Sequence, residues 1–188
     1  MSSQSSWAGT MQKSNRSVNT VALPSESLVF WMYKNADFAD AYEIQLQEST
    51  ITDPETIARF LFSHQVPWIA LLMRIRDTTV ARFGIKTSKQ LQNCGGKRIG
   101  IFKIYETSTH EIVLGEDDIH LDFRLSVLYL AKTGSAGSRP SLILSTVVNC
   151  HNLLGRIYIT LIAPFHRLVV KSCLQKAARI GWPSSSIY

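Results

Sequence analysis

Apolar and polar residues alternate in two stretches of this chain, and the alternation predicts strands. In residues 42–47, Tyr42, Ile44 and Leu46 alternate with Glu43, Gln45 and Gln47. Residues 115–128 alternate more strictly, because every odd position from Ile119 to Val127 is apolar. A period of two is typical of a strand with one buried face. The polar face of the second stretch carries three side chains that could act in catalysis or binding, those of His120, Asp122 and Arg124.

Three other segments have helical signals. Asp53 is a candidate N-cap, Pro54 suits the first helical position, and an apolar stripe follows to residue 63. A second helix is expected from Pro67 to Gly84. A long helix is expected from about Leu153 to Arg179, capped by Asn152 and kinked or split at Pro164.

The remaining apolar segments complete an α+β order. Residues 28–33 are expected to form a strand or an anchoring segment, and further strands are expected at 99–105, 111–114, 120–130 and 142–150. The short connections favour an antiparallel meander. The predicted fold is a curved antiparallel sheet wrapped around the long C-terminal helix, with two short helices after the first strand. Such an arrangement often leaves a cavity between sheet and helix.

Length and composition predict one domain in this 188-residue chain, of which 45% is apolar. We expect a disordered, serine-rich tail over residues 1–27, a single domain over 28–180 and a loose end over 181–188. A transit peptide is the alternative for the tail. No apolar run reaches the length of a membrane span, and residues 157–165 are interpreted as a buried helix face.

The cysteine content and the charge distribution indicate the expected location and partners of the protein. The three cysteines have no metal-type spacing, which suits a reducing, cytoplasmic location. The net charge is −2 up to residue 122 and +8 beyond it. The basic third could attract nucleic acid, a membrane surface or an anionic ligand. Because its charges are dispersed, we expect no nucleic-acid partner, and the basic helix is instead expected to lie near acidic strand ends of its own domain.

Three motifs carry a resemblance to a known family. They are "EIVLGEDDIHLDFRLSV" (111–127), "STVVNCHNLLGRIYITLIAPFHRLVV" (145–170) and "PWIALLMRIRDTTVARFGIK" (67–86). Together they resemble the family called domain of unknown function 2867, over roughly Ala36 to Ala178. That family is similar to the helix-grip superfamily of START-like and polyketide-cyclase-like proteins, which bind hydrophobic small molecules. The resemblance implies the same fold, but no catalytic residue can be carried over from it.

The polar face of residues 120–124 has two interpretations. Either it faces solvent, or a second layer covers it and its side chains bond one another, because an unpaired buried charge is costly. In the second case we expect a catalytic group: Asp122 orients His120, which exchanges a proton, while Arg124 or Arg167 holds an oxyanion of the ligand. A metal site built on His120 and Asp122 is a weaker alternative, so we expect neither a metal nor a cofactor.

The sequence therefore predicts a protein that binds a hydrophobic small molecule in an internal cavity, with or without acid–base turnover of a carbonyl compound. His166 is expected to line the pocket, to cap it, or to bond a backbone carbonyl freed by Pro164. The alternative is a non-catalytic interaction or scaffold domain that uses its basic C-terminal helix. A homodimer is compatible with either function. The residues expected to line the cavity are Trp68, Phe102, Tyr105, Tyr158, Phe165, His166 and Arg167.

Overall fold

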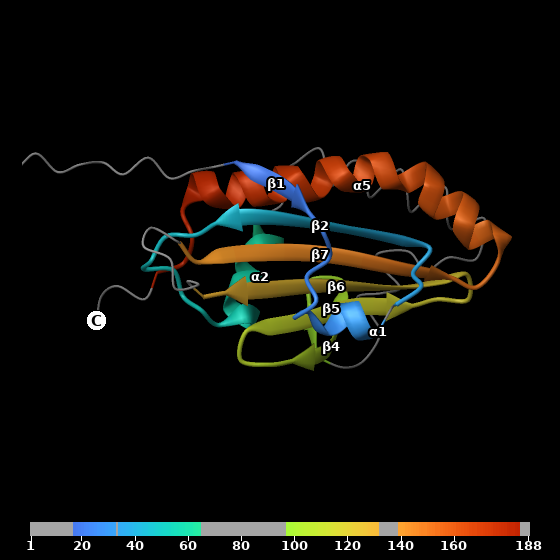
Figure 1. The fold of residues 1–188 in the computed structure, drawn as a ribbon, viewed down its shortest axis with the longest axis horizontal. Coiled ribbons are helices and arrows are strands. Elements are labelled where there is room, and N and C mark those ends of the chain that lie inside the picture. Colours follow the sequence, from blue (N-terminus) through green and yellow to red (C-terminus); the bar gives the residue numbers. More distant parts are fainter. Residues whose placement is uncertain (1–16, 33, 65–96, 132–138, 185–188) are drawn as a thin grey trace, which may run out of the picture.

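Seven antiparallel strands form one sheet, and a 28-residue helix lies along it in the computed structural model (Figure 1). The structure describes residues 17–32, 34–64, 97–131 and 139–184. The strand order is β1-β2-β7-β6-β5-β4-β3. The strands are β1 (Val18–Val21), β2 (Phe38–Gln45), β3 (Arg98–Ile99), β4 (Phe102–Thr107), β5 (Glu111–Asp117), β6 (Leu121–Leu130) and β7 (Ser141–Cys150), and the helices are α1 (Leu28–Met32), α2 (Pro54–Ser63) and α5 (Leu153–Ile180).

The inner face of the sheet, which we define as the face that carries α2 and α5, holds the main core. Alternate residues of the central strands point there, including Tyr42 and Ile44 of β2, Leu144 of β7 and Val127 of β6. They pack against Leu174 and neighbouring residues of α5. The expected α+β architecture, with a long C-terminal helix against an antiparallel sheet, is thus confirmed.

The outer face is covered by the N-terminal segment that contains α1. Val29 of α1 packs against Val113 and Val147. Beneath the start of α1, the carboxylate of Glu111 accepts hydrogen bonds from the Ser27 hydroxyl (2.6 Å) and from the Leu28 backbone N–H (2.9 Å). The solvent-facing interpretation of this side of β6 is therefore wrong for Arg124, which is buried.

Local signals placed the helix starts correctly. The Asp53 carboxylate accepts from the Thr56 N–H at 2.8 Å, and Pro54 opens α2. Asn152 caps α5 by accepting from the Gly155 N–H at 3.1 Å. Helix α5 is not split at Pro164; it continues through the proline and bends along its length (Figure 1).

Four segments differ from the sequence-based expectation. Residues 18–21 form β1 inside the expected tail, and the apolar run at 28–32 is helical. The expected strand 99–105 is a hairpin, because Gly100 adopts a left-handed φ of 61° in the turn between β3 and β4. Trp182, in the expected loose end, is buried in the main core. The expected second helix at 67–84 lies outside the described residues.

The largest difference from the sequence-based expectation concerns the burial of the apolar side of α5. Residues 157–165 were expected to be buried, yet Ile157 and Leu161 are 57% and 65% exposed. The helix instead meets the sheet through another side, which includes the small residues Gly155 and Ala163. By length and composition alone, α5 is also apolar enough to cross a membrane; its most apolar window has a mean hydropathy of 1.4 and is 17% buried.

Candidate functional site

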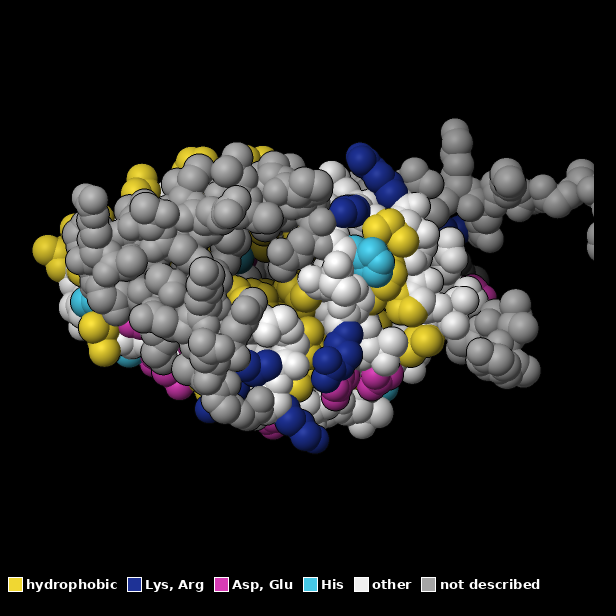
Figure 2. All heavy atoms as spheres, turned by 180° about the vertical axis from the view of Figure 1, so that it is seen from behind, with side chains coloured by type: hydrophobic (Ala, Val, Ile, Leu, Met, Phe, Trp, Pro, Cys, Tyr) yellow, Lys and Arg dark blue, Asp and Glu magenta, His cyan; other side chains and the backbone are white. Residues whose placement is uncertain are grey.

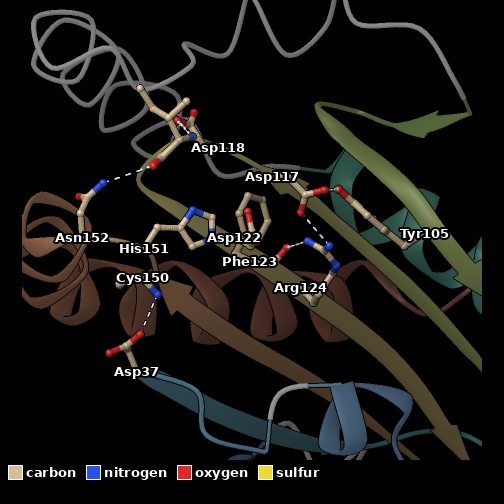
Figure 3. Close-up of polar contacts among 11 residues, drawn as sticks. Asp37, Tyr105, Asp117, Asp118, Asp122, Phe123, Arg124, Cys150, His151 and Asn152 are labelled. Carbon is tan, nitrogen blue, oxygen red and sulfur yellow. Dashed lines mark hydrogen bonds and ion pairs between the residues drawn. The ribbon is translucent and has the colours of Figure 1, made fainter.

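Polar side chains gather at one end of the sheet, where β5 turns into β6 and β7 leads into α5 (Figure 3). All three expected catalytic residues lie here. His120 precedes β6 instead of belonging to it, whereas Asp122 and Arg124 are in the strand. Their hydrogen bonds and ion pairs lead to three different sets of neighbours.

Arg124 lies over the glycine of the neighbouring strand. Gly115 is its register partner on β5, and a Cβ there would meet the Arg124 side chain at 3.0 Å. The guanidinium contacts Asp117 at 2.7 Å, donates to the Phe123 carbonyl at 2.8 Å and stacks 3.6 Å from the centre of the Tyr105 ring. Figure 3 shows it turned toward Asp117. The Arg124 guanidinium therefore links side chains and backbone of β4, β5 and β6.

Asp117 receives hydrogen bonds from two sides. The Tyr105 hydroxyl donates to it at 2.7 Å, opposite the contact with Arg124. Partial burial works to raise the pKa of Asp117, but the hydrogen bonds from Tyr105 and Arg124 outweigh burial and lower that pKa. Burial and the hydrogen bond to Asp117 raise the pKa of Tyr105. Asp117 therefore stays ionised and Tyr105 stays neutral, which stabilises their contact.

His120 contacts the residues at the start of α5. Its Nδ1 lies 3.0 Å from the side-chain amide nitrogen of Asn152, the residue that caps the helix. Its backbone carbonyl accepts from the His151 N–H at 2.9 Å. A Cβ on Gly155 would lie only 2.2 Å from the same carbonyl oxygen, so the first turn of α5 packs directly on His120. The residue thus holds the β5–β6 turn against the helix.

Asp122 pairs with a different histidine from the one that it was expected to orient. Its Oδ2 lies 3.0 Å from Nε2 of His151, at the end of β7. Its register partners are Asp117 on β5 and Asn149 on β7. The expected Asp122–His120 pair is therefore replaced by an Asp122–His151 pair on the outer side of the sheet (Figure 3).

The residues expected to line a cavity lie in several places. Phe102 is on the inner face, with ring centres 5.1 Å from Phe62 and 5.8 Å from Phe123. Tyr105 is on the outer face beneath Arg124, because side chains alternate along β4. Trp68 lies outside the described residues.

The other expected lining residues are all on α5. Phe165 and Arg167 are exposed, and Tyr158 and His166 are half-buried. Of these four, His166 reaches the inner face of the sheet, where Nε2 lies 3.1 Å from the Thr146 hydroxyl. The partner of Nε2 is thus a side chain and not a backbone carbonyl freed by Pro164, which was one of the three alternatives for His166.

A second polar group, which sequence reasoning missed, surrounds His166 between α5 and the sheet. We call Asp40, Tyr42, Thr146 and His166 the Asp40–His166 group. Asp40 and Thr146 are register partners on β2 and β7. Nε2 of His166 lies 3.5 Å from Oδ1 of Asp40, whose Oδ2 accepts from the Tyr42 hydroxyl at 3.3 Å. Oδ1 of Asp40 is buried and has no hydrogen-bond partner among the described residues.

The surroundings of this group are aromatic and basic. Phe38 meets the His166 ring edge-on, with ring centres 5.8 Å apart. Arg167 lies 5.8 Å from the centre of the Phe38 ring, and Lys171 lies 5.3 Å from that of Tyr42. Burial, together with the charge of Asp40, raises the pKa of Tyr42 to about 12. Tyr42 is therefore a neutral donor at physiological pH.

Sequence carried only a weak signal for this group. Asp40 and Tyr42 occupy alternate positions of β2, so they share its inner face. The approach of His166 on α5 depends on how the helix lies across β2 and β7, which no local pattern encodes. Among the described residues, no group of three or more His, Cys, Asp or Glu side chains could hold a metal ion.

Comparisons with known proteins place the chain in one family. Residues 32–173 match the family model described as "Protein of unknown function (DUF2867)", which covers more than half of the chain. No curated protein and no solved structure matches it significantly.

Proposed function

The chain belongs to the DUF2867 family, and from that premise we propose that it binds an apolar small molecule between the inner face of the sheet and α5. The ligand carries a polar group, such as a carbonyl, that meets the Asp40–His166 group. The helix-grip, START-like character of the fold is part of the same proposal.

One observation carries it: the Asp40–His166 group places a histidine and a carboxylate, 3.5 Å apart, next to the apolar core between the sheet and α5. Burying a carboxylate oxygen without a hydrogen-bond partner is costly, so such groups are often functional. Figure 2 shows the molecule from behind, and apolar side chains are visible among polar ones on this side. An apolar pocket with a few converging polar groups is the usual form of a small-molecule site.

The acid–base role that the sequence suggested for His120 is assigned in this proposal to His166. The charge of Asp40 acts on the imidazole from 3.5 Å, the Thr146 hydroxyl lies within hydrogen-bond distance of its Nε2, and the Tyr42 hydroxyl donates to Asp40. His166 can then donate a hydrogen bond or a proton to the ligand's carbonyl oxygen. His120, Asp122 and Arg124 have a structural role in this proposal, since their contacts hold the end of the sheet in place.

The test is binding of a naphthyl ketone probe, Prodan, whose emission shifts to the blue in apolar surroundings. We expect the full-length protein to bind it, and His166→Gln to weaken binding by about threefold to tenfold through loss of one hydrogen bond. His110→Gln is the matched control, since this histidine is exposed on the loop before β5. A His166→Gln protein that binds the probe like wild type, or a wild type that does not bind, contradicts the proposal.

A further inference from the structure

Helix α5 carries an exposed row of large apolar side chains, which we call the apolar stripe. Its members follow one another at intervals of four or three residues, so they share one side of the helix. They are Leu153 (71% exposed), Ile157 (57%), Leu161 (65%), Phe165 (47%) and Leu168 (58%). A contiguous exposed apolar row of this kind marks an interaction surface.

The stripe is distinct from the proposed ligand site. His166 points the other way, to Thr146 on the sheet, and Val170 and Leu174 on the buried side of α5 pack in the core. The helix therefore cannot turn its stripe inward without giving up the packing of Val170 and Leu174.

The charge of α5 indicates what the stripe meets. The helix has five basic residues and no acid. Arg156, Arg167 and Lys171 occupy the side of the helix next to the stripe, at helical spacing from one another. A shallow, open hollow lies on the stripe itself, where Arg156 and Thr160 border Ile157 and Leu161, so that a guanidinium lies next to apolar side chains. Apolar side chains with a basic border are the pattern of a helix that lies in the surface of an anionic membrane.

A second copy of the chain fits the stripe less well. Two such helices packed face to face would bring basic borders together without acids from either helix to offset them. Asp37 of the sheet side is one acid close to the border, 3.3 Å from Arg156. An acidic lipid surface offers negative charge that complements the basic residues along the border of the stripe.

We propose that the protein docks on anionic lipid bilayers through the apolar stripe, with α5 parallel to the membrane surface and the sheet on the aqueous side. The stripe enters the boundary between headgroups and acyl chains, and the basic border meets lipid phosphates and carboxylates. Because the opposite side of α5 is packed on the sheet, the helix does not span the bilayer.

The experiment is flotation of the full-length protein with vesicles of phosphatidylcholine, alone or mixed with phosphatidylserine. We expect flotation with the anionic vesicles, less with the neutral ones, and a decrease as salt is raised. Leu161→Glu is expected to weaken binding by about tenfold or more, since it replaces an apolar contact by a charge of the wrong sign. Leu168→Glu should act in the same way.

Ile180→Glu is the matched control: the residue is 49% exposed on the same helix but lies away from the stripe. It adds the same charge, so it should leave flotation nearly unchanged. The proposal fails if wild type does not float with anionic vesicles or if Leu161→Glu floats like wild type. A wild-type dimer in sedimentation that Leu161→Glu dissociates would also overturn it, because the stripe would then bind a second copy.

Discussion

Glu111 shows how a single buried charge orders the N-terminal segment. Its side chain is 2% exposed, and it accepts hydrogen bonds from Ser27, Leu28 and Ser126. These partners come from α1, from the residue before it and from β6, so the carboxylate fastens the segment to the outer face. A carboxylate that accepts several hydrogen bonds offsets much of its desolvation cost.

Glu111→Ala is therefore expected to lower the free energy of unfolding by about 2–4 kcal/mol, because two buried hydroxyls and the part-buried Leu28 N–H lose their carboxylate acceptor. Chemical denaturation measures the change. Glu106→Ala, at an exposed position of β4, is the matched control and should change stability by less than about 0.5 kcal/mol. Equal effects of the two substitutions would show that Glu111 does not hold α1.

Sequence predicted part of the candidate site at this scale. The alternation around Asp122 and Arg124 placed them correctly on one face of β6. It could not supply their partners, since Asp117 and His151 come from other elements. For the same reason Asp40 went unnoticed: its importance arises only where α5 brings His166 over β2.

At the scale of elements, the β5–β6 turn and α5 meet in a close backbone contact. Gly155 in the first turn of α5 faces the carbonyl of His120, where a Cβ would be 2.2 Å from the oxygen. Glycine is needed here for close approach and not for backbone conformation. The contact fixes where the helix leaves the sheet.

Gly155→Ala is expected to destabilise the protein, although the same change inside a helix normally stabilises it by about 1 kcal/mol. The clash involves backbone, which cannot move aside without shifting the helix start, so we expect a loss of about 1–3 kcal/mol. Thermal unfolding measures the sign. Thr160→Ala, at an exposed position five residues further along the helix, is the control. A higher melting temperature for Gly155→Ala would contradict the packing.

Elements with strong local signals were predictable. Asp53 with Pro54, and Asn152, marked the starts of α2 and α5. The apolar run of α1 is too short for its period to distinguish helix from strand. Trp182 was expected in a loose end, since nothing near it in the sequence indicates burial. In the structure it lies in the main core, beside a bridge between Thr50 and Ser184 that joins distant parts of the chain.

At the scale of the whole molecule, both faces of the sheet are covered by other elements. A neutral tyrosine side chain is partly buried on each face. Tyr42 lies on the inner face and Tyr105 on the outer face, and burial raises the pKa of both, to about 12 for Tyr42. An unfolded tyrosine has a pKa of about 10. Between those values the folded state holds more protons than the unfolded state.

Stability from these phenols is therefore fully present below pH 10 and is lost as pH rises toward the folded-state pKa of about 12. We expect the free energy of unfolding to fall with pH across that interval. Tyr105→Phe removes one of the two phenols, so its stability should fall less steeply than that of wild type. The comparison is between slopes, measured by denaturation at several pH values, and identical slopes would contradict the burial of Tyr105.

The most direct test of the central claim compares the two faces of the sheet by methyl NMR while the naphthyl ketone probe is added. Leu144 and Val148 report on the inner face, and Val113 and Val147 report on the outer face. We predict that the inner-face methyl signals and the His166 ring shift in proportion to binding while the outer-face signals stay in place. Shifts confined to Val113 and Val147, or no shifts at all, would contradict a ligand site between the sheet and α5.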